Sequence, residues 1–395
     1  FHVEMQIDAL AHIAKTAPDV PVPRVIKTSD GRSYHMAVDR KGVKRLIWVM
    51  TSLQGKPLAG IRPHDGILLD EIGYMCDSVT TALANFTHPE LSREMKWDLT
   101  RADWVYPHIS IINEPDDRQI VGAIIDDYRT HISDALAKRP KTTIHNDPND
   151  YNLLVMPGMD HDTMTPKPSL TGIVDFGDMI SAPAVCDLAI LAAYIILDDL
   201  RPLEKLCAVV AGYHRACPLT PDDIALVYPL LLTRYAVSMV NAGIMAKERP
   251  DDPYVMVSQA PIRAFLHQFK HVGNDEVTAR LRLACGLDIT SSSKRTLDWI
   301  KKNRSVFAPA FGFDLVDMPL CSCAVGDTAL PQNPTNLTAG EAANLISVDD
   351  DNTPKAMVGH YLEPRLVYTE DAFLTAAHPV DGRRTMHLGI DVFAA

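Results

Sequence analysis

The fold class is decided by one polar stretch, Ile144–Leu154, which reads IHNDPNDYNLL. In this stretch Asp147 follows His145 by two residues, and Asn152 follows Asp147 by five. β-prone and apolar residues flank the polar centre, and this pattern predicts a tight turn between two short strands. We place these strands at Thr142–Ile144 and Asn152–Val155.

A second stretch, Gly172–Asp178, lies further along the chain and reads GIVDFGD. Its apolar half completes a predicted strand, Ser169–Val174, and Asp175 follows directly. A carboxylate at the end of an apolar strand is presented rigidly, and Gly177 allows the chain to turn sharply just after it. The second stretch therefore offers one well-positioned acidic group.

The two stretches together carry the groups that phosphoryl transfer requires. This chemistry needs a carboxylate that orients the acceptor hydroxyl, oxygen ligands for Mg²⁺, and donors that hold the nucleotide. Asp147 is placed to hold a hydroxyl group and take its proton, while Asn152 and Asp175 offer oxygen atoms to a metal ion. Each motif alone is common by chance, but H-x-D-x₄-N between strands, followed by a strand ending in D-F-G, is a specific set of spacings.

Towards the N-terminus the pattern predicts one helix and several strands. Apolar residues recur at helical spacing over His2–Ala14, and Val20–Pro23 (VPVP) is extended because proline lacks an N–H and restricts the residue before it. Strands are predicted at Arg24–Thr28, Tyr34–Val38 and Arg45–Thr51. The last of these (RLIWVMT) is largely apolar, so we expect it to be buried on both faces.

Towards the C-terminus helices prevail. Helical spacing of apolar residues predicts helices over Asp65–Phe86 and Ile120–Leu136, and an almost wholly helical stretch over Ala184–Asn303. Over Ser305–Arg384, Pro, Gly, Asn and Asp are frequent and no long helix is expected, which is typical of a connecting or separately folded segment. The predicted fold class is α+β.

Composition excludes several classes of partner. The 395 residues contain 50 Asp and Glu against 38 Lys and Arg, giving a formal net charge of −12. Such a surface repels nucleic acid phosphates and anionic membranes, so we expect neither as a partner. The longest apolar run, Ala182–Leu197, is short for a membrane span and is interrupted by Asp187, so it predicts a core helix.

The cysteines indicate the compartment. There are seven, irregularly spaced and without a C-x-x-C pair, which argues against a disulfide framework or a structural zinc site. No signal peptide opens the chain. We therefore expect a cytoplasmic protein.

The ordered set of motifs resembles the aminoglycoside phosphotransferase and choline kinase superfamily and, within it, the hydroxylysine kinases. The resemblance spans about residues 2–303 and includes Glu4–Gln6 (EMQ), Val20–Pro23 and Leu53–Leu58 (LQGKPL) besides the two stretches above. It implies a protein-kinase-like two-lobed fold with a mostly helical C-lobe, followed by a β- and coil-rich segment. It also implies a kinase that moves the γ-phosphate of ATP or GTP to a hydroxyl of a small amine-containing metabolite such as hydroxylysine.

The resemblance implies roles for single residues. Asp147 would be the catalytic base, His145 would brace its loop, and Asn152 and Asp175 would bind Mg²⁺. Glu4 would pair with the phosphate-binding lysine. The backbone of a hinge would face the purine, and this hinge consists of Thr51, Ser52 and Leu53.

Two features depart from the superfamily pattern. Asn146 stands where the superfamily usually has glycine, a change that removes no chemical group. The chain also begins inside the first helix, whereas the resemblance places the Gly-rich loop and the lysine on strands before it. We therefore expect residues 1–55 to be a truncated N-lobe and residues 56–303 the catalytic C-lobe, a chain that lacks activity by itself.

Three further carboxylates are candidates for substrate contact. Asp150 and Asp178 lie close to the two motifs and could either meet the ammonium group of a substrate or remain solvated. Asp187 lies on an apolar helix, where a carboxylate needs a partner. It either braces the loop or contacts the substrate, and its apolar setting favours the brace.

The tail carries a separate signal. Residues 304–380 are expected to connect or to fold separately, and residues 381–395 resemble the opening of a lysostaphin-type metallopeptidase domain. There His387 and Asp391 would be the first two zinc ligands, but a zinc site needs at least three protein ligands, so the site is incomplete. The whole stretch is similar to bacterial fusions of such a kinase with a peptidase-like module and an aminotransferase-fold domain, which implies further domains downstream.

Two alternatives to a metabolite kinase stay open. An antibiotic kinase of the aminoglycoside type would have a more open and more acidic acceptor pocket. A kinase-like regulatory module would bind a ligand without turning it over, and the presence of Asp147, Asn152 and Asp175 argues against that reading.

Overall fold

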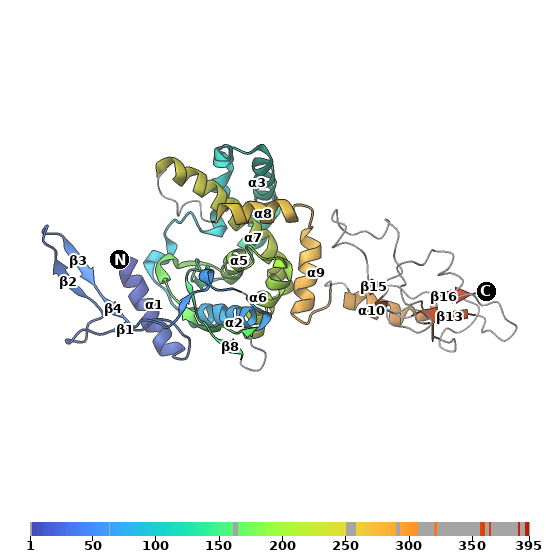
Figure 1. Cartoon of the computed structure of the whole chain (residues 1–395), viewed down its shortest axis with the longest axis horizontal. Coiled ribbons are helices and arrows are strands. Elements are labelled where there is room, and N and C mark those ends of the chain that lie inside the picture. Colours follow the sequence, from blue (N-terminus) through green and yellow to red (C-terminus); the bar gives the residue numbers. More distant parts are fainter. Residues whose placement is uncertain are drawn as a thin grey trace. The chain divides into compact units, whose positions relative to one another are not determined.

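The computed structural model describes residues 2–62, 64–160, 165–249, 258–289 and 293–306, together with short strands at 320–321, 356–359, 363–364, 386–387 and 392–394. The chain divides into two compact units, Phe1–Asp298 and Trp299–Ala395. The first unit has an α+β fold in which small sheets and helices share one core (Figure 1). The motifs at 145–152 and 172–178 both lie in this unit.

The N-terminal region contains the predicted helix and two ladders of strands. Helix α1 (His2–Thr16) buries Met5, Leu10 and Ile13 along one face, as its apolar spacing predicts. β1 (Val25–Ile26) pairs with β4 (Val49–Met50), and β2 (His35–Val38) pairs with β3 (Lys44–Ile47), both antiparallel. The predicted strands at 24–28 and 34–38 are thus confirmed, in shorter form for the first.

The prediction of one strand buried on both faces over Arg45–Thr51 is wrong. The structure divides it at Trp48 into β3 and β4, and the side chains of Ile47, Val49 and Met50 are 50%, 54% and 46% exposed. Each strand pairs within a two-stranded ladder, and these three apolar side chains stay about half exposed. An apolar run shows which side chains can be buried, but neighbouring elements decide whether they are.

Two ladders anchor the polar stretch. β6 (Lys141–Ile144) pairs with β11 (Ile180–Pro183), whereas β7 (Leu153–Met156) pairs with β10 (Ser169–Ile173) and with β5 (Lys56–Pro57). The two strands that flank the polar turn are therefore confirmed, but they do not pair with each other. The loop between them, residues 145–152, passes from one ladder to the other and is fixed at both ends.

Two pairs of closely packed helices form the main part of the helical half. Asp65 caps α2 (Gly66–Ala82) by accepting a hydrogen bond from the Leu68 N–H at 2.7 Å. α2 packs against α6 (Pro202–Ala216), and α5 (Ala184–Ile195) packs against α7 (Pro221–Glu248). The α2–α6 crossing is close because glycine lies at the contact: a Cβ on Gly73 would come within 2.0 Å of the Val209 carbonyl oxygen.

The remaining helices of the first unit complete this half. The predicted helix over Ile120–Leu136 begins earlier and contains a wider turn, since α3 (Pro115–Asp127) continues through a π-helical turn (Tyr128–Ile132) into α4 (Ser133–Ala137). α8 (Gln259–Phe269) and α9 (Asn274–Ala284) follow α7, and α10 (Ser293–Lys302) spans the boundary between the two units. Short helical turns and strands connect these elements: η1 (Leu58–Gly60), η2 (Pro89–Ser92), η3 (Leu99–Ile111), η5 (Phe176–Asp178), η7 (Arg304–Val306), β8 (Met159–Asp160) and β9 (Thr165–Pro166).

Helix α7 is long and apolar enough to span a membrane, but 83% of its most apolar window is buried inside the fold. A capping box at its start, in which Thr220 and Asp223 bond each other's backbone N–H groups, closes the helix N-terminus. Burial of this kind is typical of the core helix of a globular protein.

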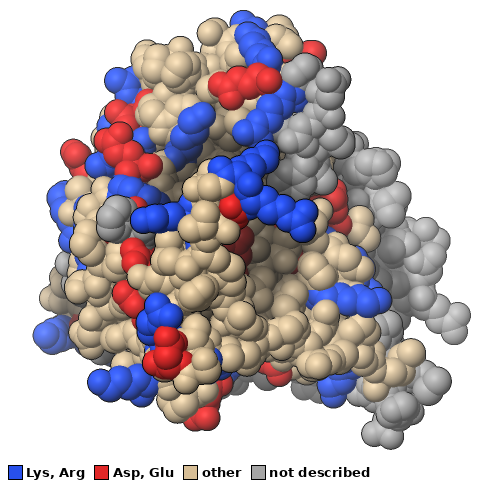
Figure 2. Space-filling view, turned by 90° about the vertical axis from the view of Figure 1, so that its left-hand side faces the viewer, with Lys and Arg blue, Asp and Glu red and all other residues tan. Residues whose placement is uncertain are grey.

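The charged side chains on the face shown in Figure 2 are of both signs and interspersed, and acidic atoms lie in a hollow near its centre. The formal net charge of −12 therefore does not produce a uniformly acidic surface on this face.

Besides the end of α10 and the turn η7, the described residues of the second unit form only short strands. β12 (Leu320–Cys321), β13 (Ala356–Gly359) and β16 (Val392–Ala394) form one sheet, and β14 (Glu363–Pro364) pairs with β15 (Met386–His387). Most of the predicted connecting segment lies outside the described residues. The same holds for Asp391 and for the side chain of His387, so the proposed start of a zinc site stays a prediction.

Candidate active site

The buried side chain of Asp187 holds the backbone at the start of the 145–152 loop. Its two carboxylate oxygens accept hydrogen bonds from the N–H groups of His145, at 2.9 Å, and Asn146, at 2.7 Å. Thr80 donates a third bond at 3.3 Å. Asp187 is fully buried, and this burial raises its pKa above the ordinary value.

This position decides between the two roles considered for Asp187. A side chain with no exposed surface, whose oxygens are engaged by the loop backbone, cannot contact a substrate without leaving its partners. These contacts are those expected of a brace for the loop, and Asp187 lies among apolar residues on α5.

Val174 joins the two motifs through both of its backbone groups. Its N–H donates to the Asn152 carbonyl oxygen at 2.9 Å, and its carbonyl oxygen lies 3.0 Å from the His145 Nε2. The imidazole of His145 also packs edge-on against Phe176, with ring centroids 4.9 Å apart. Both ends of the 145–152 loop are thus tied to Val174, which directly precedes Asp175, so the loop of Asp147 is fixed against the segment that carries Asp175.

Asp147 is oriented by three side chains. Its Oδ2 accepts from Asn149 Nδ2 at 2.8 Å and from Asn152 Nδ2 at 3.2 Å. Its Oδ1 lies 3.2 Å from an Arg234 guanidinium nitrogen. The carboxylate keeps 21% of its surface exposed, so it is fixed in direction and still reachable from the adjoining cavity.

The donor set fits a hard divalent cation. The Nδ2 of Asn152 is engaged by Asp147, and its Oδ1 accepts no hydrogen bond from the part of the chain that the structure describes. Asp175 is exposed in a left-handed conformation (φ 67°), and only its Oδ1 accepts an internal bond, from the Gly177 N–H at 3.2 Å. No three His, Cys, Asp or Glu side chains converge as a metal cluster among the residues searched, so phosphate and water oxygens would have to complete such a site.

Arg93 supports the turn that carries Asp175 and was missed by the sequence analysis. Its guanidinium donates to the carbonyl oxygens of Gly177 at 2.6 Å, Met179 at 2.8 Å and Glu90 at 3.0 Å. Because these bonds link η2 to η5, the Asp175 turn is held by a residue far away in the sequence. Nothing in the sequence around Arg93 marks it out for this role.

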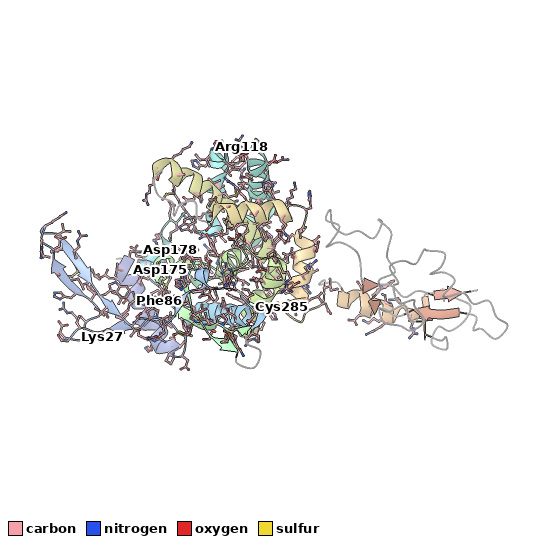
Figure 3. The ribbon with its side chains drawn as sticks, viewed as in Figure 1. Lys27, Phe86, Arg118, Asp175, Asp178 and Cys285 are labelled. Carbon is pink, nitrogen blue, oxygen red and sulfur yellow. The ribbon has the colours of Figure 1, made fainter. Side chains whose placement is uncertain are left out.

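The two other candidate carboxylates lie close to the site. Burial raises the pKa of Asp150 to about 6, and its side chain lines the same cavity as Asp147. Burial first, and then the charges of Asp147 and Asp175, raise the pKa of Asp178. Asp175 and Asp178 lie beside each other near the N-terminal end of the ribbon (Figure 3).

Glu4 points from α1 towards the N-terminal strands. It accepts a hydrogen bond from the Tyr34 hydroxyl at 2.7 Å, and this bond is the main cause that lowers its pKa. The predicted pairing of Glu4 with a phosphate-binding lysine stays a prediction.

The predicted hinge lines a cavity of about 420 Å³ that also contains Asp175. Thr51 is fixed by a pair of bonds with the backbone of Arg24, at 2.8 and 2.9 Å. The N–H groups of Ser52 and Leu53 bond no described residue, so they are free to meet a ligand. Trp48 and Met50 supply apolar surface beside them.

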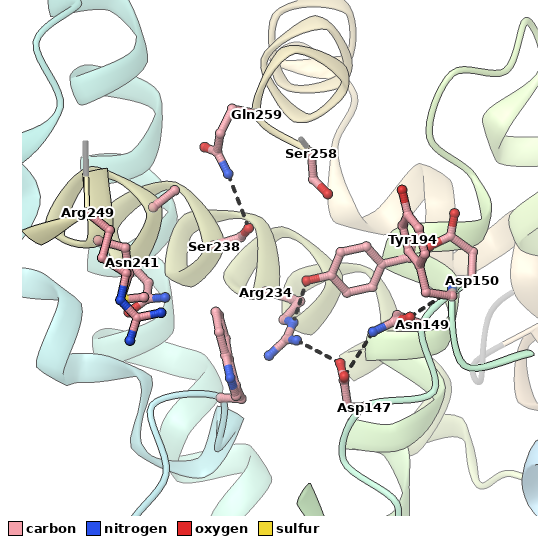
Figure 4. A pocket seen from close by; sticks show the side chains of 14 residues that line it. Asp147, Asn149, Asp150, Tyr194, Arg234, Ser238, Asn241, Arg249, Ser258 and Gln259 are labelled. Atoms are coloured by element: carbon pink, nitrogen blue, oxygen red, sulfur yellow. Dashed lines mark hydrogen bonds and ion pairs between the residues drawn. The ribbon is translucent and has the colours of Figure 1, made fainter. Parts of the chain in front are cut away.

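A second cavity, of about 350 Å³, is lined by Asp147 (Figure 4). We call it the acceptor pocket. Its walls come from the 145–152 loop, Trp97, Tyr194, the start of α8, and one face of α7 that carries Arg234, Ser238 and Asn241. The sequence analysis missed these residues, although a single arginine within the apolar run Leu230–Val240 is a recognisable signal.

A model of the phosphotransferase enzyme family (APH) matches residues 2–219, more than half of the chain. This chain belongs to that phosphotransferase family. The match covers the 145–152 loop and the Asp175 turn, so the resemblance to this superfamily is confirmed for the segment that carries the site.

Curated relatives of this phosphotransferase include hydroxylysine kinases. That of Danio rerio is 29% identical over 240 residues, which cover 60% of this chain and 66% of the relative. That of Xenopus laevis is 26% identical over 65% of this chain and 71% of the relative, and that of Bos taurus is 26% identical over 59% and 62%. The chain thus spans about two thirds of the length of these relatives.

Similar solved structures include an amicoumacin kinase in complex with AMP-PNP, at 14% identity and a TM-score of 0.46, covering 75% of this chain and 81% of that structure. A microcompartment-associated aminopropanol kinase has 19% identity and a TM-score of 0.45, covering 73% and 84%. The family assignment rests on the sequence match and not on these structures.

Proposed function

We propose that this protein is a kinase that moves the γ-phosphate of ATP or GTP to a hydroxyl group of a small amine-containing metabolite of the hydroxylysine type. The observation that carries the proposal is the pair of contacts that Val174 makes with Asn152 and His145, since they tie the loop of Asp147 to the segment that leads into Asp175. Asp147 lines one cavity and Asp175 lines the other. The hydroxylysine kinases among its relatives support the class of acceptor.

Asp147 is the group that we propose receives the proton of the acceptor hydroxyl. Its hydrogen bonds to Asn149, Asn152 and Arg234 fix the direction of both oxygens before a substrate arrives. A hydroxyl bound in the acceptor pocket then meets an already oriented carboxylate, which reduces the entropic cost of reaching the transition state.

Asn152 and Asp175 are the residues that would hold Mg²⁺. When bound, the ion would neutralise the charge that develops on the phosphate oxygens. The brace of Arg93 on the Gly177 and Met179 carbonyl oxygens would keep the Asp175 turn in place.

The nucleotide would occupy the cavity lined by Thr51, Ser52 and Leu53. The unengaged N–H groups of Ser52 and Leu53 suit the hydrogen-bond acceptors on a purine edge, and Trp48 supplies apolar surface. In this proposal the base would lie at the hinge and the phosphates would point towards Asp175. The absence of disulfide bonds among the five described cysteines favours a cytoplasmic location. These cysteines are all free thiols: Cys76, Cys186, Cys207, Cys217 and Cys285.

The test is nucleotide turnover by the full-length product of the gene that encodes this chain. Release of ADP or GDP is measured with Mg²⁺ and a panel that contains 5-hydroxylysine, ethanolamine, choline and kanamycin. We expect acceptor-dependent release with a small hydroxylated amine, and we expect Asp147→Asn to lower kcat by roughly 10²- to 10⁴-fold. Asp103→Asn, an exposed carboxylate on η3, is the matched control and should leave kcat unchanged.

Other outcomes identify the alternatives. Efficient turnover of kanamycin alone would indicate an antibiotic kinase. Nucleotide binding without turnover of any acceptor would contradict the proposal and indicate a regulatory module.

A further inference from the structure

One face of α7 carries polar side chains into the acceptor pocket, although the helix is otherwise apolar. Arg234, Ser238 and Asn241 follow each other at intervals of four and three residues, the spacing of one helical face. All three are buried to at least nine-tenths, with 2%, 8% and 7% of their surface exposed. Polar groups in such positions need partners.

Arg234 is only partly satisfied by the protein. Its Nε donates to the Tyr194 hydroxyl at 3.2 Å, and its Nη2 donates to Asp147 Oδ1 at 3.2 Å. Its Nη1 is buried and has no hydrogen-bond partner among the residues that the structure describes. Figure 4 shows the guanidinium projecting from α7 towards Asp147 and Tyr194, at the centre of the pocket.

Aromatic rings flank this guanidinium. Its Cζ atom lies 4.5 Å from the centroid of the Trp97 ring and 5.4 Å from that of Tyr194. The rings hold the cation in a fixed plane and exclude water, so the electrostatic attraction for an anion is stronger here than at the surface. Trp97 is half-buried on the turn between η2 and η3 and lines the acceptor pocket together with Arg234, so an anion bound in the pocket would lie against this guanidinium.

Asn241 supplies a second unsatisfied group on the same face. Its Oδ1 is buried and accepts no hydrogen bond from the described part of the chain. It lies two helical turns from Arg234, about 10 Å along the axis. The pocket therefore offers an unpaired donor with positive charge near Asp147 and an unpaired acceptor deeper along α7.

We propose that Arg234 selects acceptors that carry a carboxylate group, which binds its free Nη1 while Nη2 stays on Asp147. Asn241 Oδ1 then accepts an N–H of the same molecule. A planar guanidinium binds carboxylates with directed, charge-assisted bonds. A polycation is disfavoured, because it would bring further positive charge against a buried arginine whose only paired carboxylate is Asp147.

The inference rests on the proposed function for the identity of the pocket, but binding tests it separately. The probes are two pairs that differ by one carboxylate: 5-hydroxylysine with 1,5-diaminopentan-2-ol, and homoserine with 3-aminopropan-1-ol. Their affinities for the full-length protein are measured by calorimetry without nucleotide, and kcat/KM is measured with nucleotide. In at least one pair we expect the carboxylate member to be favoured by roughly 10- to 100-fold.

Two variants assign this preference to Arg234. Arg234→Met retains the length and apolar stem of the side chain and should abolish the discrimination within the pair, whereas Arg234→Lys should keep part of it. Arg280→Met is the matched control, since Arg280 is exposed on α9 and pairs only with Glu276.

Each outcome decides the question. Equal affinity of both members of each pair in the wild-type protein, or no binding of any probe, would overturn the inference. An equal loss for both members in Arg234→Met would also overturn it, because Arg234 would then act only by positioning Asp147. Selective binding of the carboxylate probes without turnover would support Arg234 as the selecting residue and contradict the kinase proposal instead.

Discussion

Among single residues of the 145–152 loop, Asn146 has the least favourable conformation and hydrogen bonding. Its backbone is left-handed (φ 67°), its N–H donates to Asp187, and both polar atoms of its buried amide lack hydrogen-bond partners among the described residues. The left-handed conformation explains why glycine suits this position, and asparagine is among the residues that tolerate it best.

Replacing Asn146 by glycine should therefore stabilise the fold. Asn146→Gly removes an unsatisfied buried amide and the strain of a positive φ, against a smaller loss from the greater freedom of the unfolded chain. We expect the free energy of unfolding to rise by about 1 kcal/mol in denaturant titrations. Asn113→Gly, on an exposed loop without a positive φ, should lower it slightly, and a loss for Asn146→Gly as well would contradict this account.

A second prediction concerns Asp77 on α2, where burial raises the pKa of the carboxyl to about 6. The folded-state pKa lies above that of the unfolded chain, so the folded protein binds the proton more tightly. The stabilising contribution is complete below about pH 4 and is lost as the pH rises through about 6.

Asp77→Asn should remove this loss. Its free energy of unfolding relative to the wild type should increase between pH 4 and pH 7, by up to roughly 3 kcal/mol, because two pKa units correspond to that range. Denaturant titrations at several pH values measure the difference. Asp103→Asn serves as the control, and a difference that is independent of pH would show that Asp77 does not titrate in this window.

At the scale of elements, the site depends on contacts between segments that lie far apart in the sequence. Arg93 joins η2 to the Asp175 turn, and glycines let α2 and α6 approach closely beneath the 145–152 loop. Gly73 faces the Val209 carbonyl oxygen, and Gly212 faces that of Asp70. These contacts set the distance between α2 and α6, which carry no candidate catalytic group themselves.

A methyl group at the α2–α6 crossing should be costly. In Gly73→Ala the new Cβ would lie 2.0 Å from the Val209 carbonyl oxygen, which is backbone and cannot rotate away. We expect a loss of about 3 kcal/mol in the free energy of unfolding. Gly122→Ala on α3, where a Cβ meets nothing within 4 Å, should instead gain about 0.5–1 kcal/mol, and similar effects of the two would refute the close crossing.

Removing the brace on the Asp175 turn should act on the metal. In Arg93→Met the Gly177 and Met179 carbonyl oxygens lose their donor, so Asp175 is held less firmly. If Asp175 binds Mg²⁺, the Mg²⁺ concentration for half-maximal turnover should rise by roughly 10-fold or more, with a smaller effect on the KM for the acceptor. Arg101→Met, which removes an exposed arginine paired with Glu94, should leave it unchanged. An equal change in both constants would indicate general damage to the fold.

At the scale of the whole molecule, every candidate group of the phosphotransferase site lies in the unit Phe1–Asp298. This unit also contains the continuous hydrophobic core that surrounds α5 and α7. The site and the core that supports it therefore form one structural body.

The fragment of residues 1–306 should accordingly fold by itself. We expect it to unfold cooperatively, with a Tm within about 2–4 °C of that of the whole chain, because a change of that size corresponds to at most about 1 kcal/mol. Circular dichroism during heating provides the measurement. A broad, non-cooperative transition in the fragment would show that the core needs residues after 306.

The sequence by itself determined the chemical groups and their local order. His145, Asp147, Asn152 and Asp175 lie within two short stretches, and the flanking apolar residues predict the strands that the structure contains, since turns and strand patterns depend on neighbouring residues. Tertiary structure alone decided the partners. Arg234 reaches Asp147 across 87 residues, Asp187 lies beneath the loop and not in the pocket, and the apolar strands β3 and β4 are exposed. Such contacts depend on how distant elements pack, and neither periodicity nor spacing within one segment carries that information.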